Sequence, residues 1–233
     1  MSNIAILPAR LGSKRIKKKN IKIFYGKPMI QWTYEILKKS NIFSDIIVST
    51  ESDKIVRVCK NIGINTFIKR PAKLSDDNIG IKKVMKHAIN QMEKKIKFEN
   101  VCCIFPCSPF LKIKNLKKAL KYIKNNKNCV VHPVSRFRCP PEKSLIMKKN
   151  NQLKVVNMRD MKKMTQDFTS KYHDVGQFYF AHKSYWFKEK KKVKGIGIEL
   201  QIWETVDIDN LEDWEFAKIL FKFRKKNILK IKN

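Results

Sequence analysis

The stretch IAILPARLGSKRIKKKN, residues 4–20, gives the first indication of the fold. Its first four residues, Ile4-Ala5-Ile6-Leu7, are all apolar and form a run with the length of a buried strand. The segment that follows, residues 8–20, is polar and contains six basic residues. A buried strand that leads into a polar loop is typical of α/β proteins, whose ligands bind beyond the carboxyl ends of the strands.

Strand and helix patterns alternate along the rest of the chain. Residues 28–40, for example, place Ile30, Tyr34 and Leu37 at helical spacing. This alternation predicts an α/β fold: a mostly parallel, Rossmann-like sheet with helices on both faces. We expect further strands at residues 46–49, 66–68, 101–105, 129–133, 177–181 and 201–206, and further helices at residues 53–62, 81–91, 116–124 and 211–223.

The alternation stops between residues 135 and 171. Residues 145–158 have enough alternation for a hairpin around Lys149-Asn150-Asn151. We therefore expect a single domain over residues 1–233, from which residues 135–171 leave as a small excursion. A dimerisation arm is the role that we expect for this excursion.

The charge of the chain allows two interpretations. Its 52 Lys and Arg residues exceed its 20 Asp and Glu residues, which gives a formal net charge of +32. Such a charge can indicate a nucleic acid or an anionic membrane as the partner. However, only eight of the 52 are Arg, the residue that reads bases and phosphates most effectively. The Lys residues are also spread along the whole chain, which favours a solvated surface.

The absence of targeting signals completes this picture. No apolar run reaches the roughly 18 residues of a membrane span, and no secretory signal pattern is visible. We expect a cytoplasmic protein that binds neither nucleic acid nor membrane.

The basic loop after the first strand has the composition of an anion-binding site. Gly12 permits close approach of the backbone to a ligand. Arg10, Lys14 and Lys19 can contact several phosphate oxygens, and Ser13 can complete the site with backbone amides. Phosphoryl and nucleotidyl transfer require such neutralisation of phosphate charge. On charge alone, an exposed basic loop explains the pattern equally well.

Two carboxylates lie near the end of the chain, in Val206-Asp207-Ile208-Asp209. On a strand, Asp207 and Asp209 would point to the same face. They could then bind Mg²⁺, which is commonly held by one or two carboxylates together with substrate phosphates. The alternative is that Asp209 or Asn210 caps the helix expected from residue 211.

These two segments together resemble the cytidylyltransferases that activate acidic sugars, a family that includes the CMP-sialic acid synthetases. The likeness lies in Ala9-Arg10-x-Gly12-Ser13-Lys14 with Lys19-Asn20, and in residues 204–209 with Glu212-Asp213-Trp214. It implies a nucleotide-diphospho-sugar transferase-like fold with a dimerisation excursion. It also implies Mg²⁺ on Asp207 and Asp209, and contacts to the triphosphate of CTP from Arg10, Gly12, Ser13, Lys14, Lys19 and Asn20.

Three further segments extend the resemblance. Residues 70–80 resemble the family's nucleotide loop, which implies contacts from Arg70, Asp77 and Gly80, although a surface turn explains them almost as well. Residues 105–110 hold the place of the family's turn after the fourth strand, with Ser108 as a substrate contact. Tyr172-His173-Asp174-Val175-Gly176-Gln177-Phe178-Tyr179 is similar to the pseudaminic acid branch. That likeness implies sugar contacts from His173, Asp174 and Gln177.

The resemblance implies a nucleotidyltransferase that joins CTP to pseudaminic acid, an acidic nine-carbon sugar, and releases pyrophosphate. The implied catalytic residues are Arg10, Lys14, Lys19 and Asp209. The same reaction on legionaminic acid, sialic acid or the eight-carbon acid KDO is the nearest alternative. A basic nucleic-acid-binding protein is the alternative from another class. The family often has a Gly where this chain has Leu11, and smaller residues where it has Ile79 and Ile81.

Overall fold

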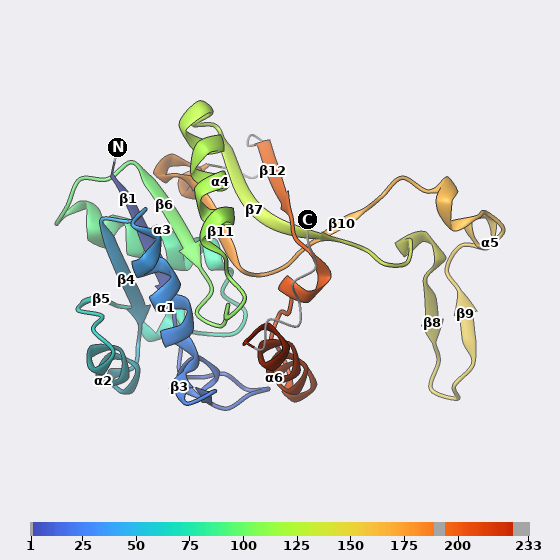
Figure 1. The fold of residues 1–233 in the computed structure, drawn as a ribbon, viewed down its shortest axis with the longest axis horizontal. Helices are drawn as coiled ribbons and strands as arrows, with labels where there is room; N and C mark the ends of the chain where they lie inside the picture. The colour runs from blue at the N-terminus through green and yellow to red at the C-terminus, as the bar shows by residue number, and fades with distance from the viewer. Residues whose placement is uncertain (1, 189–193, 226–233) are drawn as a thin grey trace.

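A computed structural model describes residues 2–188 and 194–225. The central feature is an eight-stranded sheet with the order β10-β7-β11-β6-β1-β4-β5, in which β12 also pairs with β7 (Figure 1). Its strands are β1 (Asn3–Pro8), β4 (Asp45–Thr50), β5 (Thr66–Lys69), β6 (Asn100–Ile104), β7 (Cys129–Arg136), β10 (Tyr172–Asp174), β11 (Phe178–His182) and β12 (Lys194–Glu199). The helices are α1 (Met29–Ser40), α2 (Asp53–Asn61), α3 (Ile81–Glu93), α4 (Ile113–Asn125), α5 (Met158–Met161) and α6 (Leu211–Lys225).

The sheet is parallel where the sequence alternates between strand and helix. β1 pairs in parallel with both β4 and β6, and β4 pairs in parallel with β5. β11 runs antiparallel between β6 and β7, while β12 runs parallel to β7. The α/β class and the mostly parallel sheet predicted from the sequence are therefore confirmed.

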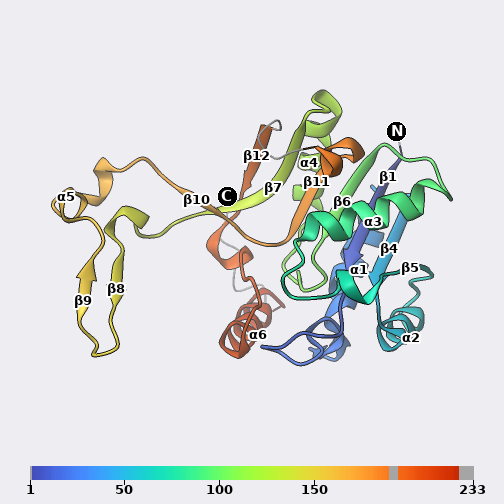
Figure 2. The ribbon, with the colours of Figure 1, turned by 180° about the vertical axis from the view of Figure 1, so that it is seen from behind.

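Helices cover both faces of the sheet because β1 is apolar on both sides. Ala5 and Leu7 belong to the core beneath α1 and α4, which lie in front of the sheet in Figure 1. Ile4 and Ile6 belong to the opposite core, which α3 covers; Figure 2 shows this face. All four side chains are fully buried, as expected for a central strand between two helical layers.

The prediction fails at the last strand. Residues 201–206 do not form one; instead β12 precedes them, and Ile202–Glu204 is a short 3₁₀ helix, η7. Glu204 is buried and forms an ion pair with Lys112, while its carbonyl accepts a hydrogen bond from Gln177. These tertiary contacts replace the strand that was expected from the sequence.

The segment between β7 and β10 leaves the sheet and extends far to one side of the body (Figures 1 and 2). It contains the antiparallel pair β8 (Leu145–Met147) and β9 (Leu153–Val155), together with α5. The hairpin expected around residues 149–151 is present, and Asn151 has a φ of 61° in its turn. We refer to residues 137–171 as the arm.

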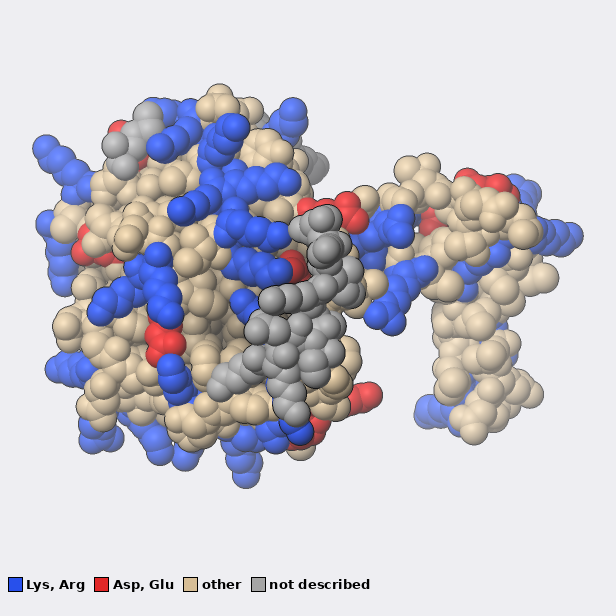
Figure 3. Space-filling view, in the orientation of Figure 1, with Lys and Arg blue, Asp and Glu red and all other residues tan. Residues whose placement is uncertain are grey.

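The surface of the body and the arm is rich in cations. In the view of Figure 3, Lys and Arg side chains are scattered over both, with few acidic side chains between them. Among the described helices, none is long and apolar enough to cross a membrane.

Candidate functional site

A cleft of about 510 Å³ lies beyond the carboxyl ends of β1, β5 and β6. Segments from the whole length of the chain line it, and this is where ligands bind in parallel α/β sheets. The lining residues are Pro8, Arg10, Ser13, Lys14, Arg15, Ile16, Lys19, Asn20, Arg70, Leu74, Asp76, Asp77, Ile79, Ile81, Val84, Phe105, Pro106, Cys107, Asp174, Gly176, Tyr179, Asp207 and Asp209.

The loop after β1 is folded back by its own side chains. Asn20 is buried, and its Nδ2 donates a hydrogen bond of 2.9 Å to the carbonyl of Arg10. Asn20 thus connects the two ends of the loop. This contact leaves Ser13, Lys14 and Arg15 at the margin of the cleft, where they can meet an anion.

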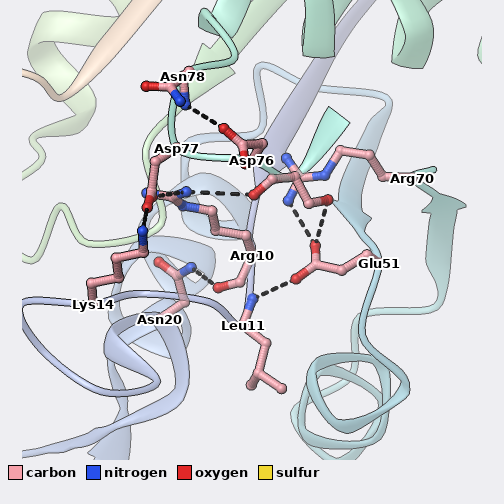
Figure 4. A network of polar contacts seen from close by, with 10 residues as sticks. Arg10, Leu11, Lys14, Asn20, Glu51, Arg70, Asp76, Asp77 and Asn78 are labelled. Carbon is pink, nitrogen blue, oxygen red and sulfur yellow. Dashed lines mark hydrogen bonds and ion pairs between the residues drawn. The ribbon is translucent and has the colours of Figure 1, made fainter. Parts of the chain in front are cut away.

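Glu51 fixes this loop to the neighbouring strand. The backbone amide of Leu11 donates a 2.7 Å hydrogen bond to its Oε1 (Figure 4). Its Oε2 accepts hydrogen bonds from Arg70 at 2.9 Å and from the Ser75 hydroxyl at 3.1 Å. Burial raises the pKa of Glu51, but the bonds from Arg70 and Leu11 outweigh it and lower this pKa overall. Glu51 therefore remains ionised and joins the loops that follow β1 and β5.

Arg70 has a structural role in this arrangement. Its side chain is only 3% exposed, and its Nη2 is bound to Glu51. The resemblance implies that Arg70 contacts the nucleotide directly. The structure places it in the cleft lining but commits its guanidinium to Glu51.

Asp77 faces the basic loop across the cleft. One oxygen of its carboxylate pairs with Arg10 and the other with Lys14, whose Nζ lies 2.8 Å away. Figure 4 shows Asp77 between these two cations. The bond to Lys14, followed by that to Arg10, lowers the pKa of Asp77.

The C-terminal carboxylates reach the same cleft. Residues 205–210 are irregular rather than the strand expected from the sequence, yet Ile208 is fully buried while Asp207 and Asp209 line the cleft. Asp209 pairs with Arg15 at 2.9 Å and with Lys19 at 3.3 Å. Lys19 also bonds to the carbonyl of Ile208. The basic loop and the acidic pair are therefore in direct contact.

Asp207 is in a position that disfavours its charge. Crowding by protein atoms, followed by repulsion from Asp209, raises the pKa of Asp207 to about 6. A carboxylate destabilised by a neighbouring carboxylate is the electrostatic condition that a bound cation relieves. The two side chains offer oxygen ligands of the kind that Mg²⁺ prefers.

The cleft contains a second polar group, next to Gly176, which approaches Asp207 closely. Asp174 accepts hydrogen bonds from the Tyr179 hydroxyl and from the Gly176 amide, and its carboxylate lies 3.4 Å from Nδ1 of His132. Asp174 and Tyr179 line the cleft, so this part of it presents a carboxylate and a phenol to a ligand.

Most of the predicted site residues meet at the cleft, but five do not line it. Gly12 is exposed on its loop, and Gly80 is exposed at the start of α3. His173 packs against Phe137 at the base of the arm, with ring centroids 5.0 Å apart. Ser108 and Gln177 are each only 3% exposed. Since Gln177 donates to the carbonyl of Glu204, its amide supports the fold beneath the cleft.

Arg15 and Tyr179 line the cleft but were not among the predicted site residues, whereas Glu51 was expected at the pocket. Arg15 stands among several basic residues, and nothing local distinguishes the one that pairs with Asp209. Glu51 does have a signal, because it directly follows a parallel strand and therefore lies at the ligand-binding edge. Tyr179 alternates with the buried Phe178 and Phe180 of β11, which places it on the other face.

A comparison with models of protein families identifies the family of this sequence. The model of the cytidylyltransferase family matches residues 4–230. The chain belongs to the cytidylyltransferase family.

Curated relatives of this cytidylyltransferase act on acidic sugars, according to their names. It is 33% identical to the pseudaminic acid cytidylyltransferase of Campylobacter jejuni subsp. jejuni serotype O:2, over 95% of this chain and 97% of that protein. It is 26% identical to the CMP-N,N'-diacetyllegionaminic acid synthase of Legionella pneumophila, over 98% of this chain and 100% of that protein.

Among solved structures, a CMP:2-keto-3-deoxy-manno-octonic acid synthetase complexed with CTP shares the fold. Its TM-score is 0.69 at 14% identity, over 96% of this chain and 100% of that one. A 4-diphosphocytidyl-2C-methyl-D-erythritol synthase is also similar, with a TM-score of 0.66 at 10% identity, over 94% of this chain and 98% of that one.

We predict that Gly176→Ala destabilises this cytidylyltransferase by roughly 1–3 kcal/mol. Gly176 has a φ of +60°, and a Cβ there would lie 2.9 Å from Oδ2 of Asp207. Denaturant unfolding measures the effect. Gly195→Ala is the matched control, because a Cβ at that position meets no described atom within 4 Å.

The double variant Gly176→Ala/Asp207→Ala should recover part of this loss, since it removes the carboxylate that the new methyl group meets. Equal losses in Gly176→Ala and Gly195→Ala would contradict the close approach of Asp207.

Proposed function

We propose that this cytidylyltransferase transfers the cytidylyl group of CTP to pseudaminic acid in the cytoplasm, giving CMP-pseudaminic acid and pyrophosphate. One observation carries the proposal: a single cleft joins the cations of the loop after β1 to the carboxylates of Asp207 and Asp209. The choice of sugar is supported by the names of two similar proteins. One is the Campylobacter jejuni protein described above, and the other is a Helicobacter pylori protein that is 32% identical to this chain.

In the proposed reaction, the anomeric hydroxyl oxygen of the sugar forms a bond to the α-phosphorus of CTP. The bond from that phosphorus to the bridging oxygen of pyrophosphate breaks, and the hydroxyl proton passes to water. Arg10, Lys14 and Lys19 lie where they can stabilise the negative charge that develops on pyrophosphate. Because they come from one loop along the cleft, they can also orient the triphosphate for attack.

We propose that Mg²⁺ binds to Asp207 and Asp209. Within the described residues, no group of three or more His, Cys, Asp or Glu side chains could hold a metal. Two carboxylates suffice for Mg²⁺, however, because substrate phosphates and water usually complete its shell. When bound, the ion would supply charge neutralisation and alignment of the phosphates.

We propose that the acidic sugar binds in the part of the cleft lined by Asp174 and Tyr179. Tyr179 and Asp174 present hydrogen-bonding groups there, and Lys19 lies on the side of Asp209. A polyhydroxylated acid needs such polar contacts, because hydroxyl groups buried without partners would weaken binding. Asp174 therefore remains our candidate for a sugar contact, together with Tyr179.

A pyrophosphate-release assay tests this function. With CTP, Mg²⁺ and pseudaminic acid we expect steady release, and Asp209→Asn should reduce turnover about a hundredfold or more. Ile23→Ala, a change on the exposed β2 strand (Ile23–Phe24) away from the cleft lining, serves as the control. Legionaminic, N-acetylneuraminic and 3-deoxy-octulosonic acids form parallel reactions.

Faster turnover of one of these acids would contradict the proposed sugar but not the cytidylyl transfer. No release with any of them, combined with tight binding of DNA that weakens steeply with salt, would favour the nucleic-acid alternative.

We further propose that a second copy of the chain covers the arm. The arm exposes many apolar side chains, among them Leu145, Ile146, Met147, Leu153, Val156, Met158 and Met164, each at least 46% exposed. A two-stranded hairpin with no further layer is marginally stable in water, and a contiguous apolar surface of this kind marks an interaction site. A symmetric homodimer is the simplest assembly that buries it.

We predict that Met147→Lys/Leu153→Lys converts a dimer into a monomer, because each change places a charge in the proposed interface. Sedimentation velocity measures the mass. Ile23→Lys is the matched control, because Ile23 is 61% exposed on the body and distant from the arm in sequence. A monomeric wild-type chain, or a double variant that remains dimeric, would contradict this assembly.

A further inference from the structure

Asp77 occupies the two cations that the proposed function assigns to phosphate. Its Oδ1 pairs with Nη1 of Arg10, and its Oδ2 lies 2.8 Å from Nζ of Lys14 (Figure 4). A carboxylate that bridges two cations in this way presents the same charge and oxygen spacing as one edge of a phosphate group. Asp77 is therefore an internal anion at the place where an external anion would bind.

The contacts of Asp77 are of a kind that exchanges readily. The side chains of Arg10, Lys14 and Asp77 are 35%, 82% and 33% exposed. Ion pairs with this exposure are weak, because water competes for both partners. Asp77 follows the short 3₁₀ helix η2 (Ala72–Leu74) in a loop that leads to α3, so its movement requires no change in the sheet.

A carboxylate in this position cannot also be a phosphate ligand. Two anions compete for the same cations, and the pKa of Asp77, lowered by Lys14 and Arg10, keeps it ionised. The resemblance to the family implies that Asp77 shapes the nucleoside pocket. The contacts of Asp77 lie on the two cations to which the proposed function assigns phosphate.

We propose that Asp77 competes with pyrophosphate for Arg10 and Lys14, and thereby promotes release of this product. The proposal rests on the proposed function. CTP displaces the carboxylate because its triphosphate carries more charge and is anchored by its nucleoside. After transfer, pyrophosphate has lost that anchor, whereas Asp77 remains attached to the chain at a high effective concentration.

The role of Asp77 differs from that of Asp209, which also faces two cations. Arg15 and Lys19 bind Asp209 from the same basic loop. Asp209, however, has Asp207 beside it, and this pair of carboxylates suits a divalent cation. Asp77 instead has one oxygen on Arg10 and the other on Lys14, so both of its oxygens lie on cations that can bind an anion.

Binding of inorganic pyrophosphate, measured by calorimetry without divalent cations, tests the proposal. Asp77→Asn should bind pyrophosphate about threefold to tenfold more tightly than the wild-type chain, because two weak ion pairs no longer oppose it. The gain should shrink in 0.5 M salt, which screens exposed charges. Asp77→Ala should give the same gain, which excludes a specific effect of the new amide.

Asp76→Asn is the matched control. Asp76 also lines the cleft and loses the same charge, but its Oδ1 accepts a hydrogen bond from the backbone of Asn78 rather than pairing with Arg10 or Lys14. Asp76 acts on Lys14 only through its charge, without a direct contact, so we expect Asp76→Asn to gain clearly less affinity for pyrophosphate than Asp77→Asn.

Weaker binding of pyrophosphate by Asp77→Asn would overturn the proposal, since Asp77 would then assist the binding of pyrophosphate rather than oppose it. Equal gains in Asp77→Asn and Asp76→Asn would also overturn it, because net charge alone would explain them. The proposed function fails separately if Arg10→Ala binds pyrophosphate as well as the wild-type chain does. In that case Arg10 is no phosphate ligand, whatever the effect of Asp77.

Discussion

Ile208 is fully buried together with Ile16 and Trp214, and this apolar cluster joins the loop after β1 to the segment that leads into α6. Full burial of an isoleucine side chain contributes about 1.5–3 kcal/mol. The part-exposed pair between Lys19 and Asp209 contributes less, roughly 0.2–1 kcal/mol. The apolar contact therefore fixes the segment. The carboxylates on either side of Ile208 are then held beside the basic loop, whether or not a ligand is present.

The sheet supplies the other half of the constraint. Because β1, β4, β5 and β6 are parallel, their carboxyl ends share one edge, and the loops that follow them converge there. Glu51 joins two of these loops through Leu11 and Arg70. The result is a cleft with opposite charges already paired: the cations of the loop face Asp77 on one side and Asp209 on the other. A ligand of high negative charge, accompanied by a cation, can exchange with both sets of pairs at once.

The sequence predicts the architecture well because periodicity reports burial directly. The run Ile4–Leu7 is apolar at every position, and every position proves to be buried between two helical layers. The prediction fails where tertiary contacts override the local pattern. A strand was expected at residues 201–206, but Glu204 is buried there and pairs with Lys112. The strand β12 was missed because Gly195 and Gly197 weaken its signal. At Gly197 a Cβ would lie 2.9 Å from Cγ2 of Val134, so a larger residue there would require the Val134 side chain to shift.

The sequence was sufficient to predict most of the charged residues that line the candidate site. It was not sufficient to predict which other side chains they contact. Arg10, Lys14, Lys19, Asp207 and Asp209 all line the cleft. The cations were predictable from their place after β1, and the two aspartates from their spacing and residue type. A motif does not reveal which polar side chain turns inward, however. Gln177 stands next to cleft residues in sequence, yet it is buried and bound to a backbone carbonyl. Arg70 is likewise committed to Glu51, which has no motif of its own.

The central claim is that the first loop and the last acidic pair bind one triphosphate together. A crystal structure of the chain with CTP and Mn²⁺, which replaces Mg²⁺ and scatters anomalously, tests it most directly. The account predicts an anomalous peak in contact with Asp207 and Asp209, with phosphate oxygens that bridge from this ion to Arg10 and Lys19. A triphosphate bound elsewhere, or an ion that contacts neither aspartate, would contradict it.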